Sequence, residues 1–136
     1  WGVEYASYSR KLCERNAQAE GGDNAIFQKG DARHLDFPDE TFDAVTSNYV
    51  YHNVMGADKR VLLLETLRVL KKGGVFALND DMKPRMYGDM EEFARELRDM
   101  GYEDVRLIDT AAEAFGSRRW AAMMMLDNSR MLVGRK

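Results

Sequence analysis

Apolar residues recur along the chain in two spacings, one typical of helices and the other of buried strands. From Tyr5 to Glu20 they fall on one helical stripe, and two consecutive glycines then predict the helix end. The run Ala25–Lys29 is a short strand candidate. Residues Phe42–Ser47 predict a second strand, which we expect to be buried on both faces.

The middle of the chain predicts a helix followed directly by another buried strand. Asp58 can cap a helix that runs to Lys72, because valine and leucine residues follow at helical spacing. Gly73 is expected to take the left-handed conformation just past its end. The apolar run Val75–Leu78 predicts a fully buried strand that ends in an Asn-Asp-Asp sequence.

The last part of the chain predicts one clear helix and two strands of a different kind. Asp89 opens a capping-box pattern, and the buried stripe of the helix that follows is predicted to be Phe93, Leu97 and Met100. Residues 104–110 alternate apolar and polar positions, which indicates a half-exposed strand. Residues 111–126 stay ambiguous, with a helix broken at Gly116 as one reading, and residues 131–134 predict a last strand.

This alternation of helices and strands predicts an α/β fold. Right-handed crossovers would give a mostly parallel sheet with helices on both faces, and the last two strands would pair antiparallel at its edge. The length of 136 residues suits a single domain spanning residues 1–136.

Polar side chains stand at the tips of two predicted strands within the stretch Gly30–Asn48. Asp31 follows the first strand, and Ser47 and Asn48 end the second. Because ligands of open α/β sheets bind at the carboxyl ends of the strands, these tips predict one common site.

Composition narrows the range of functions. Charged residues make up 32% of the chain and the net charge is −3, so no basic surface indicates nucleic acid as a partner. Its single cysteine, Cys13, is expected to be a small buried residue, and His34 and His52 lack metal-ligand spacing, so no metal is expected. Without a long apolar run or a signal peptide, we expect a soluble, cytoplasmic segment with no membrane contact.

Four short motifs in a fixed order resemble the class I S-adenosylmethionine-dependent methyltransferases. They are Asp31–Ala32, Leu35–Pro38, Asp39–Asp43 and Leu70–Gly74. The resemblance implies a Rossmann-like fold and S-adenosylmethionine as the cofactor. The glycine-rich loop and the ribose-binding acid of the family have no counterpart, so the chain resembles the C-terminal two-thirds of such a domain. On its own it is therefore expected to bind the cofactor weakly or not at all.

The resemblance also implies roles for individual residues. Asp31 and Ala32 would read the adenine, although Asp31 could instead cap a helix. Ser47, Asn48 and Tyr49 would face the amino-acid part of the cofactor, or else simply form a strand-end turn. Trp1 either stacks on the adenine or is an unattached terminal residue.

His52 lies in the loop that would face the transferred methyl group. It is a candidate general base, against the alternative of a structural histidine, since many methyl transfers need only in-line proximity. Met123, Met124 and Met125 are expected to be core or apolar surface rather than a binding groove.

The sequence therefore predicts methyl transfer from S-adenosylmethionine to a small-molecule acceptor. The alternative is a non-catalytic methyltransferase-like module that forms a homo-oligomer or binds a partner through an exposed sheet edge. A nicotinamide-dependent oxidoreductase is disfavoured, because no tyrosine has a lysine four residues later.

Overall fold

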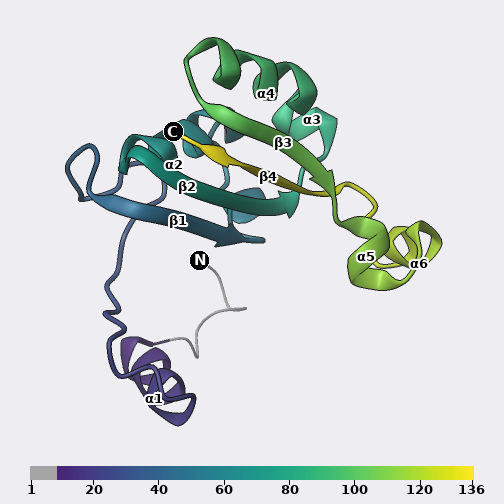
Figure 1. Ribbon diagram of the computed structural model, residues 1–136. Coiled ribbons are helices and arrows are strands. Elements are labelled where there is room, and N and C mark those ends of the chain that lie inside the picture. Colours follow the sequence, from purple (N-terminus) through teal and green to yellow (C-terminus); the bar gives the residue numbers. More distant parts are fainter. Residues whose placement is uncertain (1–8) are drawn as a thin grey trace. The chain divides into compact units, whose positions relative to one another are not determined.

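The computed structural model describes residues 9–136, which divide into two compact units after Asp31: the first ends at Asp31 and the second is Ala32–Lys136 (Figure 1). Each unit is described by itself. The first contains helix α1 (Arg10–Ala19), whose first turn is capped by the Ser9 hydroxyl. This confirms the predicted helix over its described part, whereas Tyr5 and Tyr8 lie outside the described residues. No residue of α1 is buried, so Cys13 is half-buried and not a core residue.

The predicted strand Ala25–Lys29 does not form. Residues 25–30 have no regular secondary structure, and the side chain of Ile26 is 88% exposed. A strand is stable only when a neighbouring strand accepts its backbone hydrogen bonds, and no described residue pairs with this run. The residue types of this run favour a strand, but that preference is not enough without a neighbouring strand.

The second unit is built on a four-stranded mixed sheet in the order β1-β2-β4-β3. Its strands are β1 (Phe42–Asn48), β2 (Leu70–Asp81), β3 (Glu103–Asp109) and β4 (Ser129–Arg135). β1 runs parallel to β2, whereas β4 pairs antiparallel with both β2 and β3. This arrangement confirms the α/β Rossmann-like fold and the antiparallel C-terminal strands.

β1 was expected to be buried on both faces, and this is wrong. It is an edge strand of the described sheet, and none of its residues is fully buried. Its one described neighbour, β2, is the central buried strand, and this strand extends beyond the predicted four residues to include Asn79, Asp80 and Asp81.

Helices of this unit gather on one face of the sheet. They are α2 (Lys59–Arg68), the short α3 (Pro84–Tyr87) and α4 (Met90–Asp99), preceded by the 3-10 turn η2 (Tyr51–Asn53) (Figure 1). Two short helices, α5 (Ala111–Phe115) and α6 (Arg118–Met123), lie beyond one end of the sheet. They are separated at Gly116, which has a positive φ of 70°, and so confirm the predicted break.

Helix α2 begins at its predicted cap but ends earlier than predicted. The Asp58 carboxylate accepts from the amides of Arg60 and Val61, yet the last helical residue is Arg68 rather than Lys72. Leu70 already pairs with β1, which draws the chain into the sheet. At the end of the helix, Lys136 Nζ donates to the Leu67 carbonyl over 2.9 Å.

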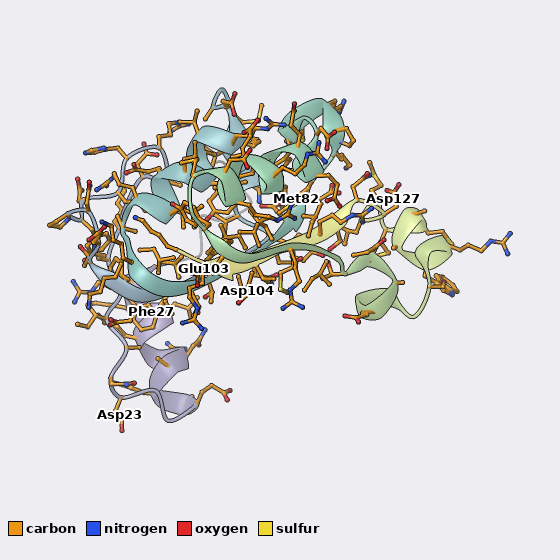
Figure 2. All side chains as sticks on the ribbon, turned by 45° about the horizontal axis from the view of Figure 1, so that its top comes forward. Asp23, Phe27, Met82, Glu103, Asp104 and Asp127 are labelled. Atoms are coloured by element: carbon orange, nitrogen blue, oxygen red, sulfur yellow. The ribbon has the colours of Figure 1, made fainter. Side chains whose placement is uncertain are left out.

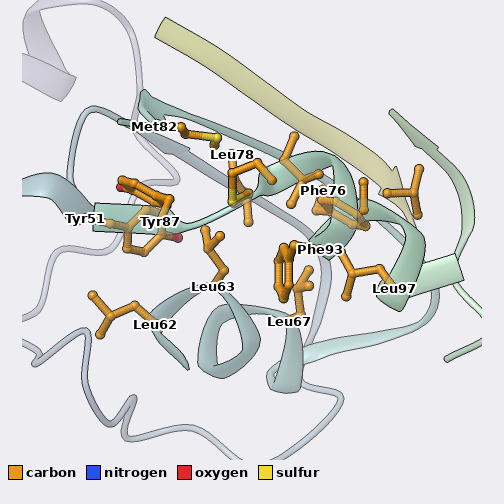
Figure 3. Close-up of a cluster of buried hydrophobic side chains, with 14 of the residues drawn as sticks. Tyr51, Leu62, Leu63, Leu67, Phe76, Leu78, Met82, Tyr87, Phe93 and Leu97 are labelled. Carbon is orange, nitrogen blue, oxygen red and sulfur yellow. The ribbon is translucent and has the colours of Figure 1, made fainter. Parts of the chain in front are cut away.

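The core lies between this sheet face and helices α2 and α4 (Figure 3). Leu63, Leu67, Leu78, Leu97 and Leu132 are completely buried there. Met100 was predicted to join the core, but its side chain is 62% exposed, because α4 ends at Asp99 and Met100 is its C-cap. Met123, Met124 and Met125 are exposed as well, so this run is apolar surface.

Candidate functional site

The carboxyl ends of β1 and β2 and the start of β4 meet at one edge of the sheet. Asn48 pairs with Asn79 at the end of β1, and Asp81 pairs with Ser129 at the start of β4. Figure 2 shows Met82, just beyond β2, and Asp127, just before β4, toward this end, with Glu103 toward the other. The strand tip Ser47–Asn48 singled out from sequence therefore shares an edge with the end of β2 and the start of β4.

A chain of side-chain hydrogen bonds runs along this edge. The Asn79 amide donates to Asn48 Oδ1 over 2.8 Å, and the Thr110 hydroxyl donates to Asn79 Oδ1 over 3.0 Å. Thr110 and Ser129 share a 2.7 Å bond, and Ser129 and the Tyr49 hydroxyl share one of 2.6 Å. Because Asn79, Thr110 and Ser129 are buried, this network holds the tips in a single arrangement.

The turn after β1 brings the next residues back over the edge. Tyr49 has a positive φ of 52°, unusual for a residue with a side chain, and its amide donates to the Asn79 carbonyl over 2.9 Å. This strained residue reverses the chain into η2, which carries Tyr51 and His52.

His52 is bound to a carboxylate that the sequence reasoning did not select. Its Nδ1 lies 2.5 Å from Oδ1 of Asp80, which is fully buried, while 30% of the His52 side chain stays exposed. Asp80 also accepts from three backbone amides, those of Tyr51, His52 and Asp81. The backbone of η2 and the ring of His52 are thus both held by one side chain of β2.

Buried aromatic hydroxyls and one lysine surround this carboxylate. Burial raises the pKa of both Tyr51 and Tyr87, and the charge of Asp80 raises them further. Burial lowers the pKa of Lys59, and the attraction of Asp80 opposes that shift. Figure 3 shows Tyr51 and Tyr87 close together at the end of the core near Leu62. The surroundings are therefore dry, and there a hydrogen bond to Asp80 is stronger than it would be in water.

Glu65 and Arg68 of helix α2 form hydrogen bonds to residues 35–39, a segment that overlaps two of the sequence motifs. The Leu35 amide donates to Glu65 over 2.7 Å, and Arg68 donates to the carbonyls of Leu35 and Phe37 over 3.0 and 2.8 Å. The Arg68 guanidinium lowers the pKa of Glu65 to about 2 by hydrogen bonding to it, against the opposing effect of burial. These hydrogen bonds fix the segment that leads into β1.

Of the residues that the sequence predicted to share one site, the structure brings four together. Ser47, Asn48, Tyr49 and His52 all lie at the edge just described. Ala32 is half-buried at the start of the second unit, whereas Asp31 ends the first unit and is exposed. Trp1 lies outside the described residues.

Four residues that build the edge were missed: Asn79, Asp80, Thr110 and Ser129. The Asn-Asp-Asp sequence that ends β2 was visible as a polar tip, and it was the one available signal for Asp80. Nothing in the spacing of Thr110 and Ser129 indicates their contact, which depends on β4 lying between β2 and β3.

One observation tests whether this edge suits a polar ligand. The Ser47 hydroxyl is buried and makes no hydrogen bond of good geometry among the described residues, although it lies close enough to the Tyr51 hydroxyl to oppose the burial-driven rise in the pKa of Tyr51, and next to it Asn48 is exposed. A buried hydroxyl without a well-formed hydrogen bond is costly, so a ligand with a donor or acceptor there would be favoured. The residues at the edge therefore fit a polar cofactor such as the one that the resemblance implies.

Comparison with known proteins agrees with this geometry. Residues 1–78, more than half of the chain, match the family described as "Methyltransferase domain". The chain belongs to the class I S-adenosylmethionine-dependent methyltransferases. The resemblance noted from sequence is confirmed, and S-adenosylmethionine is the cofactor of this family.

Characterised relatives of this methyltransferase chain act on small molecules. A demethylmenaquinone methyltransferase of Geobacillus stearothermophilus is 32% identical over 88 residues, which is 65% of this chain and 37% of the relative. A fatty-acid O-methyltransferase of Mycolicibacterium smegmatis is 38% identical over 98 residues, covering 72% and 33% respectively. The chain thus spans about a third of the length of the curated relatives it matches.

The fold is shared with an enzyme of another reaction class. The crystal structure of the [4+2]-cyclase SpnF superposes with a TM-score of 0.64 at 17% identity, covering 93% of this chain and 62% of that one. Such a likeness shows the fold alone, because one fold supports several chemistries.

The described part of the chain shows neither a metal-binding cluster nor a membrane-spanning helix. No group of three or more His, Cys, Asp or Glu side chains is placed to hold a metal ion. Within residues 9–136, no helix has both the length and the apolar character to cross a membrane.

Proposed function

We propose that this chain contributes to methyl transfer from S-adenosylmethionine to a small-molecule acceptor at the carboxyl edge of its sheet. The observation that carries the proposal is the convergence of Ser47, Asn48, Tyr49 and His52 at this edge, in a member of a methyltransferase family. Bound S-adenosylmethionine supplies a methyl group on a positively charged sulfur, which is reactive toward a nucleophile held in line with it.

The residues of the edge would hold the cofactor in defined ways. The buried Ser47 hydroxyl and the exposed Asn48 side chain would hydrogen-bond its amino-acid part, and Asn79 keeps the Asn48 amide oriented. Ala32, with its backbone amide, would contact the adenine, as the family pattern implies. The buried network behind them would keep these donors and acceptors in place before the ligand arrives.

A small molecule fits the acceptor side better than a nucleic acid. The net charge is −3, and the two characterised relatives are named for demethylmenaquinone and fatty acid. A hollow that Met82, Leu107, Asn128 and Arg130 help to line lies near the same ends of β2 and β4, and it is the place where we expect the acceptor to enter.

Nuclear magnetic resonance on ¹⁵N-labelled protein tests the cofactor side. Titration with S-adenosylmethionine to millimolar concentration should shift the amides of Ser47, Asn48 and Tyr49 saturably, even if the affinity is weak. Asn48→Ala should weaken binding, whereas Asp43→Asn, at the other end of β1, should not. Saturable shifts confined to residues away from the edge would refute the proposal.

A second candidate function is a non-catalytic module that pairs through β1. Among the described residues β1 has a neighbour on one side only, and most of its residues are exposed. An unprotected edge of this kind can add a strand from a second copy. Light scattering during size-exclusion chromatography should then show a dimer that persists without S-adenosylmethionine; a monomer at every concentration contradicts this function.

A further inference from the structure

Asp80 is a fully buried charge beside the candidate site, and the cofactor contacts proposed above do not use it. It lies in β2 two residues before Met82, on the face that is covered by the helices, and its side chain is fully buried. A buried carboxylate is costly unless its oxygens are hydrogen-bonded. The hydrogen-bond donors around Asp80 therefore indicate what this buried carboxylate does.

Both oxygens of Asp80 are saturated by donors. Oδ2 accepts from the amides of Tyr51 over 2.8 Å and His52 over 3.3 Å, and Oδ1 accepts from the amide of Asp81 over 2.7 Å. The fourth partner is His52 Nδ1, 2.5 Å from Oδ1. A carboxylate offers about four acceptor sites, so Asp80 has none left for a substrate.

This arrangement determines which nitrogen of His52 carries the proton. An ionised carboxylate can only accept, so the neutral ring must bear its proton on Nδ1 and donate it to Asp80. Nε2 is then left with a free lone pair. No described residue hydrogen-bonds Nε2, and 30% of the side chain is exposed. An imidazole held in this form is a proton acceptor.

We infer that Asp80 is a positioning residue that holds His52 as a general base, and that the acceptor of this methyltransferase is a protic one, such as a phenol-type hydroxyl. The inference rests on the proposed function. An acceptor that is already an anion at neutral pH, such as a carboxylate, needs no base. A hydroxyl attached to carbon does need one.

The proton transfer balances within the chain and its acceptor. The acceptor O–H bond breaks as a new N–H bond forms on His52 Nε2, and the electron pair of the O–H bond stays on oxygen. That oxygen becomes the nucleophile, and no oxidant or reductant takes part. The imidazolium that results is stabilised by the charge of Asp80.

Tautomer measurement tests the positioning without any cofactor. The chain has only two histidines, and His34, whose side chain is 81% exposed, serves as an internal reference. Long-range ¹H–¹⁵N correlation spectra at alkaline pH should show His52 protonated on Nδ1. The variant His34→Gln assigns the signals. A His52 protonated on Nε2 would overturn the inference and leave the proposed cofactor site intact.

Acceptor preference tests the chemistry. Transfer of a labelled methyl group should be measured with catechol and with dodecanoate, for the unaltered chain and for Asp80→Asn, His52→Gln and the control Asp43→Asn. We expect both edge variants to lower turnover with catechol by about 10²-fold or more, and the control to leave it unchanged.

Outcomes of the transfer assay separate the two proposals. Turnover with catechol, lost in His52→Gln, supports the inference. An equal loss with both acceptors in His52→Gln would assign the pair a structural role and overturn it. Transfer to dodecanoate alone would overturn it as well, while the proposed function stands. No transfer to either acceptor, at a cofactor concentration that saturates the amide shifts, would count against the proposed function itself. Because Asp80→Asn removes a saturated buried carboxylate and could unfold the chain, His52→Gln and the tautomer of the unaltered chain decide the matter independently.

Discussion

Glu65 fastens residues 35–39 to helix α2, and replacing it with glutamine should lower the free energy of unfolding in a pH-dependent way. The pKa of Glu65 is lowered from 4.5 to about 2, first by hydrogen bonding to Arg68, and its side chain is only 12% exposed. One pKa unit corresponds to about 1.4 kcal/mol, so the ionised form contributes about 3 kcal/mol at pH 7.

The sign of the pH dependence follows from the direction of the shift. A carboxyl whose pKa is lower in the folded state stabilises above its unfolded pKa, and this contribution is lost as pH falls from 4.5 toward 2. The stability difference between unaltered protein and Glu65→Gln should therefore be about 3 kcal/mol at pH 7 and about half of that at pH 3. Glutamine keeps an oxygen for the Leu35 amide, so the change isolates the charge.

Urea unfolding followed by circular dichroism at several pH values between 7 and 3 measures this difference. Glu91→Gln, an exposed glutamate on α4, is the matched control and should change stability by less than about 0.5 kcal/mol throughout. A difference for Glu65→Gln that stays constant between pH 7 and pH 3 would refute the electrostatic reasoning. It would show that the residue acts through shape alone.

Three further substitutions test the fold and the edge, each by urea unfolding. Gly74→Ala places a Cβ 2.9 Å from the backbone oxygen of Asp43, which should cost about 1–3 kcal/mol; an unchanged midpoint would mean that β1 and β2 can separate there. Leu67→Ala empties a completely buried position and should cost about 2–5 kcal/mol; a smaller loss would place Leu67 outside the core. Thr110→Val removes the buried hydroxyl that links two strand ends and should cost about 1–3 kcal/mol, whereas Thr46→Val, which is exposed, should be neutral; equal effects would contradict the network.

Local sequence predicted most of the second unit because its signals are short-range. Asp58 and Asp89 cap the helices at the predicted residues, and Gly116 breaks the last helical segment as expected. Each of these features depends on backbone hydrogen bonds or backbone conformation within a few residues, so the residue type at one position is enough to predict it. The same local signals predicted a strand at Ala25–Lys29, and there they failed, since a strand also needs a neighbour.

The candidate site divides in the same way. The sequence alone predicted the polar tip Ser47–Asn48, the adjacent Tyr49 and His52, and the membership of a methyltransferase family. Residue type and order along one segment are enough for these predictions. Only the tertiary structure decided that Asp80 binds His52 and that Thr110 and Ser129 close the edge. Those contacts join residues 28 and 19 positions apart. The first exists because β1 pairs with β2, which brings η2 over the end of β2, and the second because β3 pairs with β4. Strand order is set by how whole elements bury their apolar faces together, and no local pattern encodes it.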